Sequence, residues 1–401
     1  MGEIFIDLQN YKMKEICKEN KLLQMIAHQT LDPNDVEWLT ENLPKAPDWF
    51  SLARKAFDEG LASFLYRHCK NMNLLDTMPN DAKIFLARIY SETLLINHHF
   101  LKEMAELEKR LGKQGLKVIV FKGAALLGTV YRDIALRPME DIDLIVHKEH
   151  VEELKDVLLA MGFVQNGLYP ESFAKGILCV DIHYDYLSSH RIQSRQQSSD
   201  IKTNDVWEAA IPFDGSTSLY RLSLHDNLIA LSFHLMKHRY ERLIGFVDIA
   251  ECLKAYQHMS DWQDLVSYSK QVHADRVLLY ALILTRRLLS VDIPEELFMA
   301  LGKRNLSTTE TYLLRLKLMR APMGTVTDIL WMFQVRGLRK KGQFIIENIF
   351  PRREIMRQIF PDVPHRSTAF LERTFRMSSN ILYDLFRTAR IALKNNLPPL
   401  F

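Results

Sequence analysis

The stretch that decides the fold is Val118-Ile-Val-Phe-Lys-Gly123, which is followed along the chain by Asp141-Ile-Asp-Leu-Ile-Val146. A short, continuous apolar run with β-branched residues is typical of a strand buried on both faces. In the second segment, successive side chains of a strand point to opposite faces, so Asp141 and Asp143 share one face while Ile142 points into the core. The two segments therefore predict a buried sheet that presents paired carboxylates.

Helical patterns surround these strands. We expect helices over residues 33–43, 49–71, 79–112, 124–130 and 149–161, because apolar residues repeatedly return to one face of each segment. A loop over 132–138 ends near Pro138. A further strand pair is expected at 163–169 and 176–187, which together give a mixed sheet with helices on at least one face.

The second half of the chain is predicted to be mainly helical. The clearest patterns cover residues 225–240, 243–256, 262–271, 275–289 and 308–319. A serine-, glutamine- and arginine-rich stretch from 188 to 200 reads as an exposed loop. We therefore divide the chain into an N-terminal helical region (1–112), an α/β core (113–187), a linker with strand and loop segments (188–224) and a C-terminal helical domain (225–401).

Composition indicates a soluble globular protein of two or three domains. The 401 residues are 47% hydrophobic and 25% charged, and 52 Lys and Arg face 49 Asp and Glu, a net charge of +3. No strong overall field would hold nucleic acid or an anionic membrane, so neither is expected as a partner. The densest basic stretch, Arg336 to Arg357, is expected to be a solvated helix face.

Cysteine usage and the N-terminus favour the cytoplasm. Cys17, Cys69, Cys179 and Cys252 lie far apart and form neither a CxxC pair nor a disulfide framework. The first turns contain acidic residues, which is wrong for a signal peptide, and no apolar run is long enough to span a bilayer.

The carboxylates carry the chemistry. Hard oxygen ligands at the spacing of Asp141 and Asp143 suit Mg²⁺, or Mn²⁺ in its place, which would be bound together with phosphate oxygens and water. Asp181, in Val180-Asp-Ile-His183, offers a third carboxylate as a metal ligand or general base. Asp181 and His183 would share one face of their strand. His183 would either orient Asp181 or be an ordinary strand histidine bonded to a neighbour.

Phosphate binding is expected at the glycine. Gly123 ends a buried strand and begins a helix, so backbone amides there, including that of Ala124, can approach an anion closely. Lys122 and Arg137 add positive charge; Arg137 could instead form a structural ion pair with Asp141 or Glu140.

At these residues the chain resembles the nucleotidyltransferase superfamily of the DNA polymerase β type, whose pattern is a glycine motif, an Asp-x-Asp pair and a third acid. More narrowly, it is similar to a largely uncharacterised bacterial nucleotidyltransferase family. The shared motifs are Phe121-Lys-Gly-Ala-Ala-Leu126, Tyr131, Arg137-Pro-Met139, Asp141-Ile-Asp-Leu-Ile-Val146, Met161-Gly-Phe163 and Val180-Asp-Ile-His183. The usual Gly-Ser of the superfamily is Gly123-Ala124 here.

The resemblance continues at His234, His238 and Asp248. The two histidines lie at i and i+4 on one helix face, a spacing that binds zinc when a third ligand such as Asp248 arrives. Because the sequence has no His-Glu-x-x-His and an apolar stripe flanks the histidines, we favour histidines that link helices or face the active site.

The resemblance implies a polymerase β-like α/β core, flanked by helical regions, that transfers NMP from an NTP such as ATP to an unknown small molecule, peptide or protein and releases pyrophosphate. Asp141, Asp143 and Asp181 would hold Mg²⁺, while Lys122, Gly123, Ala124, Arg137 and His183 would bind substrate and phosphate. The alternatives are an inactive nucleotide-binding or interaction module, and an enzyme that modifies a protein partner.

Overall fold

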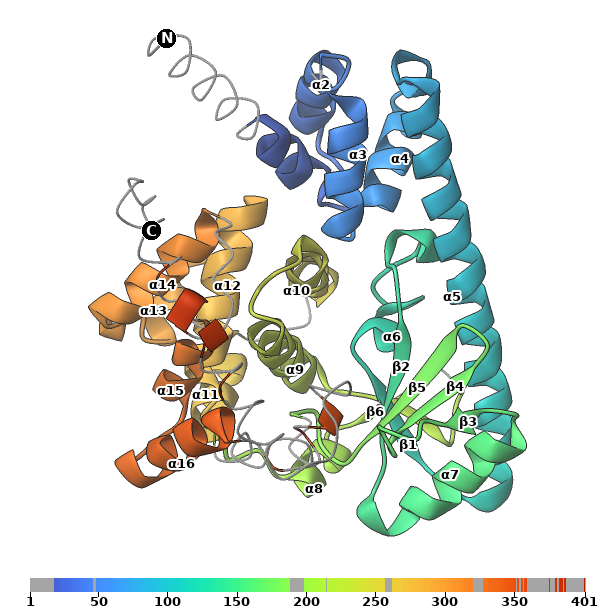
Figure 1. The fold of residues 1–401 in the computed structure, drawn as a ribbon, viewed down its shortest axis with the longest axis vertical. Helices are drawn as coiled ribbons and strands as arrows, with labels where there is room; N and C mark the ends of the chain where they lie inside the picture. The colour runs from blue at the N-terminus through green and yellow to red at the C-terminus, as the bar shows by residue number, and fades with distance from the viewer. Residues whose placement is uncertain are drawn as a thin grey trace.

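The computed structural model describes residues 18–45, 48–187, 198–213, 215–256, 262–319 and 327–350, together with scattered positions between 352 and 400. A mixed sheet lies beside a large group of C-terminal helices, and a long helix, α5, runs from the N-terminal helices along the sheet (Figure 1). The strands are β1 (Val118–Phe121), β2 (Asp141–Ile145), β3 (Val164–Gln165), β4 (Ser172–Lys175), β5 (Leu178–His183), β6 (Ile211–Pro212) and β7 (Leu219–Arg221).

The sheet has seven strands in the order β3-β4-β5-β2-β1-β7-β6. At its centre, β2 pairs antiparallel with β1 and parallel with β5, and β1 pairs parallel with β7. The predicted mixed sheet is confirmed, and β1 and β2 are adjacent strands near its centre.

The helices near the sheet are α2 (Pro33–Asn42), α3 (Trp49–Asp58), α4 (Ala62–Asn71), α5 (Asn80–Gln114), α6 (Gly123–Leu126) and α7 (Val151–Ala160). The later helices are α8 (Thr203–Glu208), α9 (Leu224–Lys237), α10 (Leu243–Tyr256), α11 (Trp262–Gln271), α12 (Asp275–Leu289), α13 (Glu295–Ala300), α14 (Thr308–Leu318), α15 (Ile329–Gln334) and α16 (Leu338–Ile349). Short 3-10 turns occupy Leu75–Thr77, Ile134–Leu136, Lys148–His150 and Lys303–Asn305.

Each face of the sheet packs into a different core. Ile142 and Leu144 of β2 pack with apolar residues of α5 and α7, such as Leu111 and Leu158. On the opposite face, Ile145 belongs to a larger core that also includes residues of α3, α4, α9, α10 and α12. The N-terminal helices, the acidic face of the sheet and the C-terminal helices are therefore joined through one continuous apolar interior.

The structure differs from the sequence-based expectation in three places. The expected helix over 49–71 is two helices, because Gly60 adopts a left-handed conformation (φ +77°) between them. The short helix after Gly123 ends at Leu126 rather than at residue 130. Strand β4 was not expected, whereas β6 and β7 lie in the segment 188–224, which was expected to contain strands and loops, and join the same sheet.

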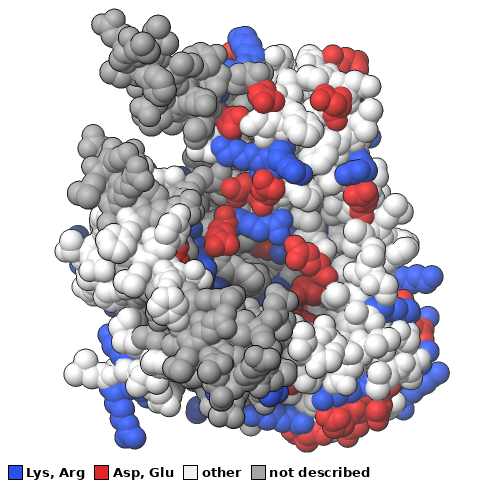
Figure 2. Space-filling view, viewed as in Figure 1, with Lys and Arg blue, Asp and Glu red and all other residues white. Residues whose placement is uncertain are grey.

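Two global features bear on partners. No helix among the described residues is long and apolar enough to cross a membrane. Figure 2 shows Lys and Arg side chains interspersed with Asp and Glu over the visible face, as the near-zero net charge leads one to expect. The described residues of the basic stretch that follows α15 include Arg336, Arg339 and Lys340, which are exposed, whereas Arg353 lies outside the described residues.

Candidate active site

Strand register brings the predicted acids together. Asp143 pairs with Asp181 across the parallel β2 and β5, and Phe121 pairs with Asp143 across the antiparallel β1 and β2. Paired residues on adjacent strands point to the same face of a sheet. Asp143, Asp181 and, two residues further along β5, His183 therefore project from the face that is covered by the C-terminal helices.

Asp143 is the most deeply buried acid of the group, with 4% of its surface exposed. Its Oδ1 accepts hydrogen bonds from Nζ of Lys122 at 2.5 Å and from Nε2 of His183 at 2.7 Å. Burial by itself would raise the pKa of Asp143, but the Lys122 charge and the His183 hydrogen bond outweigh it and hold that pKa well below its usual range. Asp143 is a carboxylate at any physiological pH.

Asp141 has different surroundings. Burial, and then repulsion from Asp143, raise its pKa to about 7. Asp181 lies beside Ser172 on β4, whose hydroxyl donates a hydrogen bond of 2.5 Å to Oδ1 of Asp181. The three acids are therefore held by different contacts, although two of them form a symmetrical motif in the sequence.

The ligand atoms of Asp143, Asp181 and His183 all lie within 4.8 Å of one another, close enough to hold one metal ion. The two carboxylates suit a hard divalent cation such as Mg²⁺ or Mn²⁺, whereas Nε2 of His183 is engaged with Asp143. Asp141 is not part of this group. Of the two roles considered for His183, the structure shows the bond to a neighbour, since the imidazole bonds Asp143 and packs edge-on against Phe121. Burial lowers the pKa of His183, partly offset by its hydrogen bond to Asp143.

Lys122 has an unusual backbone. Its φ of +55° and ψ of −138° lie in a region of backbone conformation that residues other than glycine rarely adopt. The conformation turns the chain from β1 into α6 and sends the ammonium group to Asp143, over the ring of Phe121. Such strain persists only where surrounding contacts enforce it and is common in active sites.

Gly123 occupies a tight position. A Cβ atom there would lie 3.4 Å from Nη2 of Arg137 and 3.4 Å from Cγ of Met139. The side chain of Ala124 is buried in the core between the sheet and α5. Any contact of Ala124 with phosphate would therefore use its backbone amide, and a serine hydroxyl at this position would have an apolar environment.

Arg137 forms an ion pair with Asp248, a partner that the sequence did not suggest. Its Nε and Nη2 donate to the carboxylate of Asp248 on α10, each at 2.8 Å, and the hydroxyl of Tyr131 donates to the same carboxylate at 2.7 Å. Neither Glu140 nor Asp141, the partners considered from sequence, receives this guanidinium. A phosphate contact by Arg137 stays a prediction, whereas its role in joining the loop before β2 to α10 is observed.

His234 of α9 lies beside the site, and His238, which caps the end of that helix, lies next to it. The rings of His234 and His238 are 4.4 Å apart, and His234 lines a small hollow together with Lys122, Lys237 and Trp331. Asp248 is engaged by Arg137 and Tyr131, and the one candidate metal group among the described residues is that of Asp143. The arrangement supports histidines that face the active site rather than a zinc ligand set.

Several residues of the site gave no local indication in the sequence. Ser172 belongs to the missed strand β4, and Lys237 and Trp331 come from helices far along the chain. An isolated serine, lysine or tryptophan is unremarkable in sequence, so only the sheet order and helix packing reveal these neighbours.

Comparison with known proteins gives one match. The model of a family described as "uncharacterised nucleotidyltransferase" matches residues 45–290, which includes the N-terminal helices from α3, the whole sheet and α9 to α12. Searches of curated proteins and of solved structures returned no match.

Proposed function

Because the chain belongs to the uncharacterised nucleotidyltransferase family, we propose that it is a Mg²⁺-dependent enzyme that transfers NMP from an NTP to a hydroxyl or similar nucleophile. The observation that carries this proposal is the convergence of Asp143, Asp181 and His183 beside Lys122 and Gly123. Ligands for a divalent cation and groups suited to phosphate thus occur at the ends of adjacent strands.

Asp141, Asp143 and Asp181 would hold the cation through their carboxylates, while Nε2 of His183 is engaged with Asp143. A divalent cation bound there supplies charge neutralisation for the triphosphate and polarises the reacting phosphorus. Mn²⁺ has similar ligand preferences and is expected to substitute for Mg²⁺. His183 also keeps Asp143 in place through its hydrogen bond.

The reaction itself is a substitution at phosphorus. The acceptor oxygen forms a bond to the α-phosphorus, and the bond from that phosphorus to the bridging oxygen breaks, so that pyrophosphate leaves with the electron pair. The acceptor proton passes to Asp181 acting as general base and then to solvent. Lys122 and the backbone amides from Gly123 would bind the triphosphate.

The cysteines support a reducing compartment such as the cytoplasm. Cys69, Cys179 and Cys252 are free thiols in the structure, and reduced thiols are usual where disulfides do not persist. ATP is the first nucleotide to test, since it is the most abundant NTP in that compartment.

The test is to incubate the protein with α-labelled NTPs and Mg²⁺ against a panel of small molecules, peptides, proteins and RNA, and to measure label transfer and pyrophosphate release. Asp141→Asn combined with Asp143→Asn should reduce transfer roughly a thousandfold or more, because it removes carboxylate ligands for the metal. Asp156→Asn, at an exposed acid on α7, is the control and should leave transfer unchanged.

Transfer that survived the double substitution would refute the catalytic assignment. Nucleotide binding without transfer to any acceptor would favour the inactive binding module instead. A mass increase of one NMP on a protein in the panel would identify an enzyme that modifies a protein partner.

A further inference from the structure

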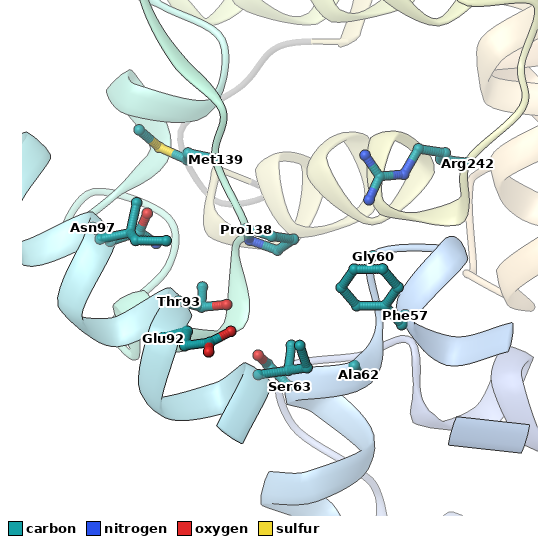
Figure 3. Close-up of a pocket in the computed structure, with 12 residues that line it drawn as sticks. Phe57, Gly60, Ala62, Ser63, Glu92, Thr93, Asn97, Pro138, Met139 and Arg242 are labelled. Atoms are coloured by element: carbon teal, nitrogen blue, oxygen red, sulfur yellow. The ribbon is translucent and has the colours of Figure 1, made fainter. Parts of the chain in front are cut away.

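A second hollow lies beside the proposed site, on the side of the N-terminal helices. Its volume is about 170 Å³, and it is formed by α4, α5, the α3–α4 turn and the loop before β2 (Figure 3). We call it the α4–α5 pocket and define it by Ser63, Thr93, Ile96, Pro138 and Met139.

The α4–α5 pocket is adjacent to the phosphate-binding turn. Met139, which lines it, lies close enough to Gly123 that a Cβ atom on that glycine would be 3.4 Å from Cγ of Met139. The side-chain amide of Asn97 on α5 donates to the carbonyls of Ile134 and Arg137 at 2.6 and 2.7 Å. Asn97 of α5 therefore holds in place the loop that separates the pocket from the site. The side chain of Met139 would lie between a group in the pocket and Gly123.

Two hydroxyl groups in the pocket have no partner. Ser63 and Thr93 are 2% and 7% exposed, yet neither hydroxyl forms a hydrogen bond with any residue that the structure describes. Figure 3 shows both oxygens turned toward the space between α5 and the α3–α4 turn. Elsewhere in the helices, Thr40 of α2 and Ser232 of α9 bond the carbonyl four residues earlier. Neither oxygen belongs to the fully enclosed atoms that lack a partner, so both open onto the pocket, where a ligand could replace water as their hydrogen-bond partner.

The other walls restrict the occupant. Phe57, Ile89 and Pro138 make the pocket largely apolar, and a cavity of roughly 150 Å³ is enough for one benzene ring. The charged residues at its rim already have partners, since Glu92 pairs with Arg88 and Arg242 pairs with Glu140. An uncharged, ring-sized group fits these walls, and its polar edge would meet hydroxyls that both donate and accept hydrogen bonds.

We propose that the α4–α5 pocket binds an uncharged, ring-sized group with a polar edge, carried by one of the two reactants. The base of the NTP and a ring of the acceptor share this chemistry. Only the identity of these two sources rests on the proposed function. The pocket itself is inferred from its size, its apolar walls and the hydroxyls of Ser63 and Thr93.

The test measures binding without turnover. Two probe series are titrated into the full chain and followed by ligand-observed NMR and calorimetry. One series is adenosine, guanosine, cytidine and uridine; the other is phenol and indole, each paired with toluene or benzothiophene, which lack the polar hydrogen. We expect a polar probe to bind, and Ser63→Ala combined with Thr93→Val to weaken its binding roughly tenfold. Nucleoside binding would identify the base as the source, and binding of phenol or indole alone would identify the acceptor.

Controls separate the pocket from general effects. Ile96→Trp should fill the pocket and abolish binding, whereas Leu95→Trp and Ser91→Ala, at exposed positions of the same helix, should leave binding unchanged. Thr93→Val should not lower the melting temperature, because the hydroxyl it removes has no partner. Absence of binding by both series, or equal binding in the pocket variants and controls, would overturn the proposal.

The outcome is independent of the catalytic assignment. The variant with Asp141→Asn and Asp143→Asn should bind the same probes as the natural chain. Loss of transfer in that variant with probe binding retained would support both proposals, whereas transfer in the natural chain without pocket-dependent binding would overturn only this one.

Discussion

At the scale of single residues, Asp141 and Asp143 are not equivalent. In sequence they are a symmetrical pair on one strand, but only Asp143 contacts Lys122 and His183. Asp141 lacks these contacts, and burial and its charged neighbour raise its pKa to about 7. The difference arises because Phe121 pairs with Asp143 across β1 and β2, so the residue after Phe121 can reach that carboxylate.

Lys122→Met should weaken the fold but strengthen metal binding. It leaves a buried carboxylate without its cation, which should lower the free energy of unfolding by about 3 kcal/mol in the absence of metal. The substitution also removes the ammonium group that contacts Oδ1 of Asp143, an atom that would bind the cation. Mn²⁺ should therefore bind more tightly, as measured by electron paramagnetic resonance. NMP transfer should nevertheless fall, since the triphosphate loses the ammonium group of Lys122 as a partner.

Lys122→Gly is the matched control for backbone strain. Glycine adopts the φ of +55° without cost, so this variant should be more stable than Lys122→Met by about 1 kcal/mol or more. Unchanged Mn²⁺ affinity in both variants would show that Lys122 does not oppose the cation.

At the scale of secondary-structure elements, Gly60 determines how the N-terminal helices meet α10. Its left-handed conformation ends the α3 segment and lets α4 begin two residues later. A Cβ atom on Gly60 would lie 2.8 Å from Cβ of Ile244, which is shorter than side-chain atoms tolerate. The α3–α4 turn therefore packs directly on the start of α10.

Gly60→Ala should destabilise the protein through both strain and collision. Gly115→Ala is its control, because Gly115 also ends a helix with positive φ but has nothing within 4 Å of an added Cβ. Strain alone should cost about 1 kcal/mol at Gly115, and the collision should add about 1–3 kcal/mol at Gly60. Denaturant unfolding measures both. Equal losses in the two variants would show that the contact with Ile244 relaxes freely.

At the scale of the whole molecule, the sheet and the helical regions are joined by a shared core and by a buried ion pair. Arg137 precedes β2, and Asp248 lies on α10; their side chains are 13% and 2% exposed. The pair holds the loop that leads to Asp141 against the C-terminal helices. The site is thus built between regions that the sequence presents as separate.

Asp248→Asn should cost about 3 kcal/mol of stability, because it leaves the buried guanidinium of Arg137 without a counterion. Thermal unfolding measures the loss. Arg137→Met combined with Asp248→Leu should restore much of it. The control is Glu140→Gln, because Glu140 lies on the same loop as Arg137 but forms an exposed ion pair, with Arg242. Its loss should lower the free energy of unfolding by no more than about 1 kcal/mol. A melting temperature for Asp248→Asn equal to that of the natural chain would contradict this account.

The sequence by itself determined the local parts of this protein. A continuous apolar run predicted β1, and period-3.6 patterns predicted the long α5 and most of the C-terminal helices. The alternation along β2 predicted that Asp141 and Asp143 share a face. These features depend on residues close together in the chain, where alternation and apolar periodicity are visible. The short β4 and β6 gave no such pattern, because a few residues carry too little periodicity to detect.

Only the tertiary structure decided which groups meet. The order of strands placed His183 against Asp143 rather than Asp181, and the packing of α10 gave Arg137 the partner Asp248. Such pairings depend on sheet register and on helix packing between distant segments. The energies that select them are sums over many apolar contacts, and no short sequence motif encodes these sums. The paired acids of β2 were therefore predictable from sequence, whereas their partners were not.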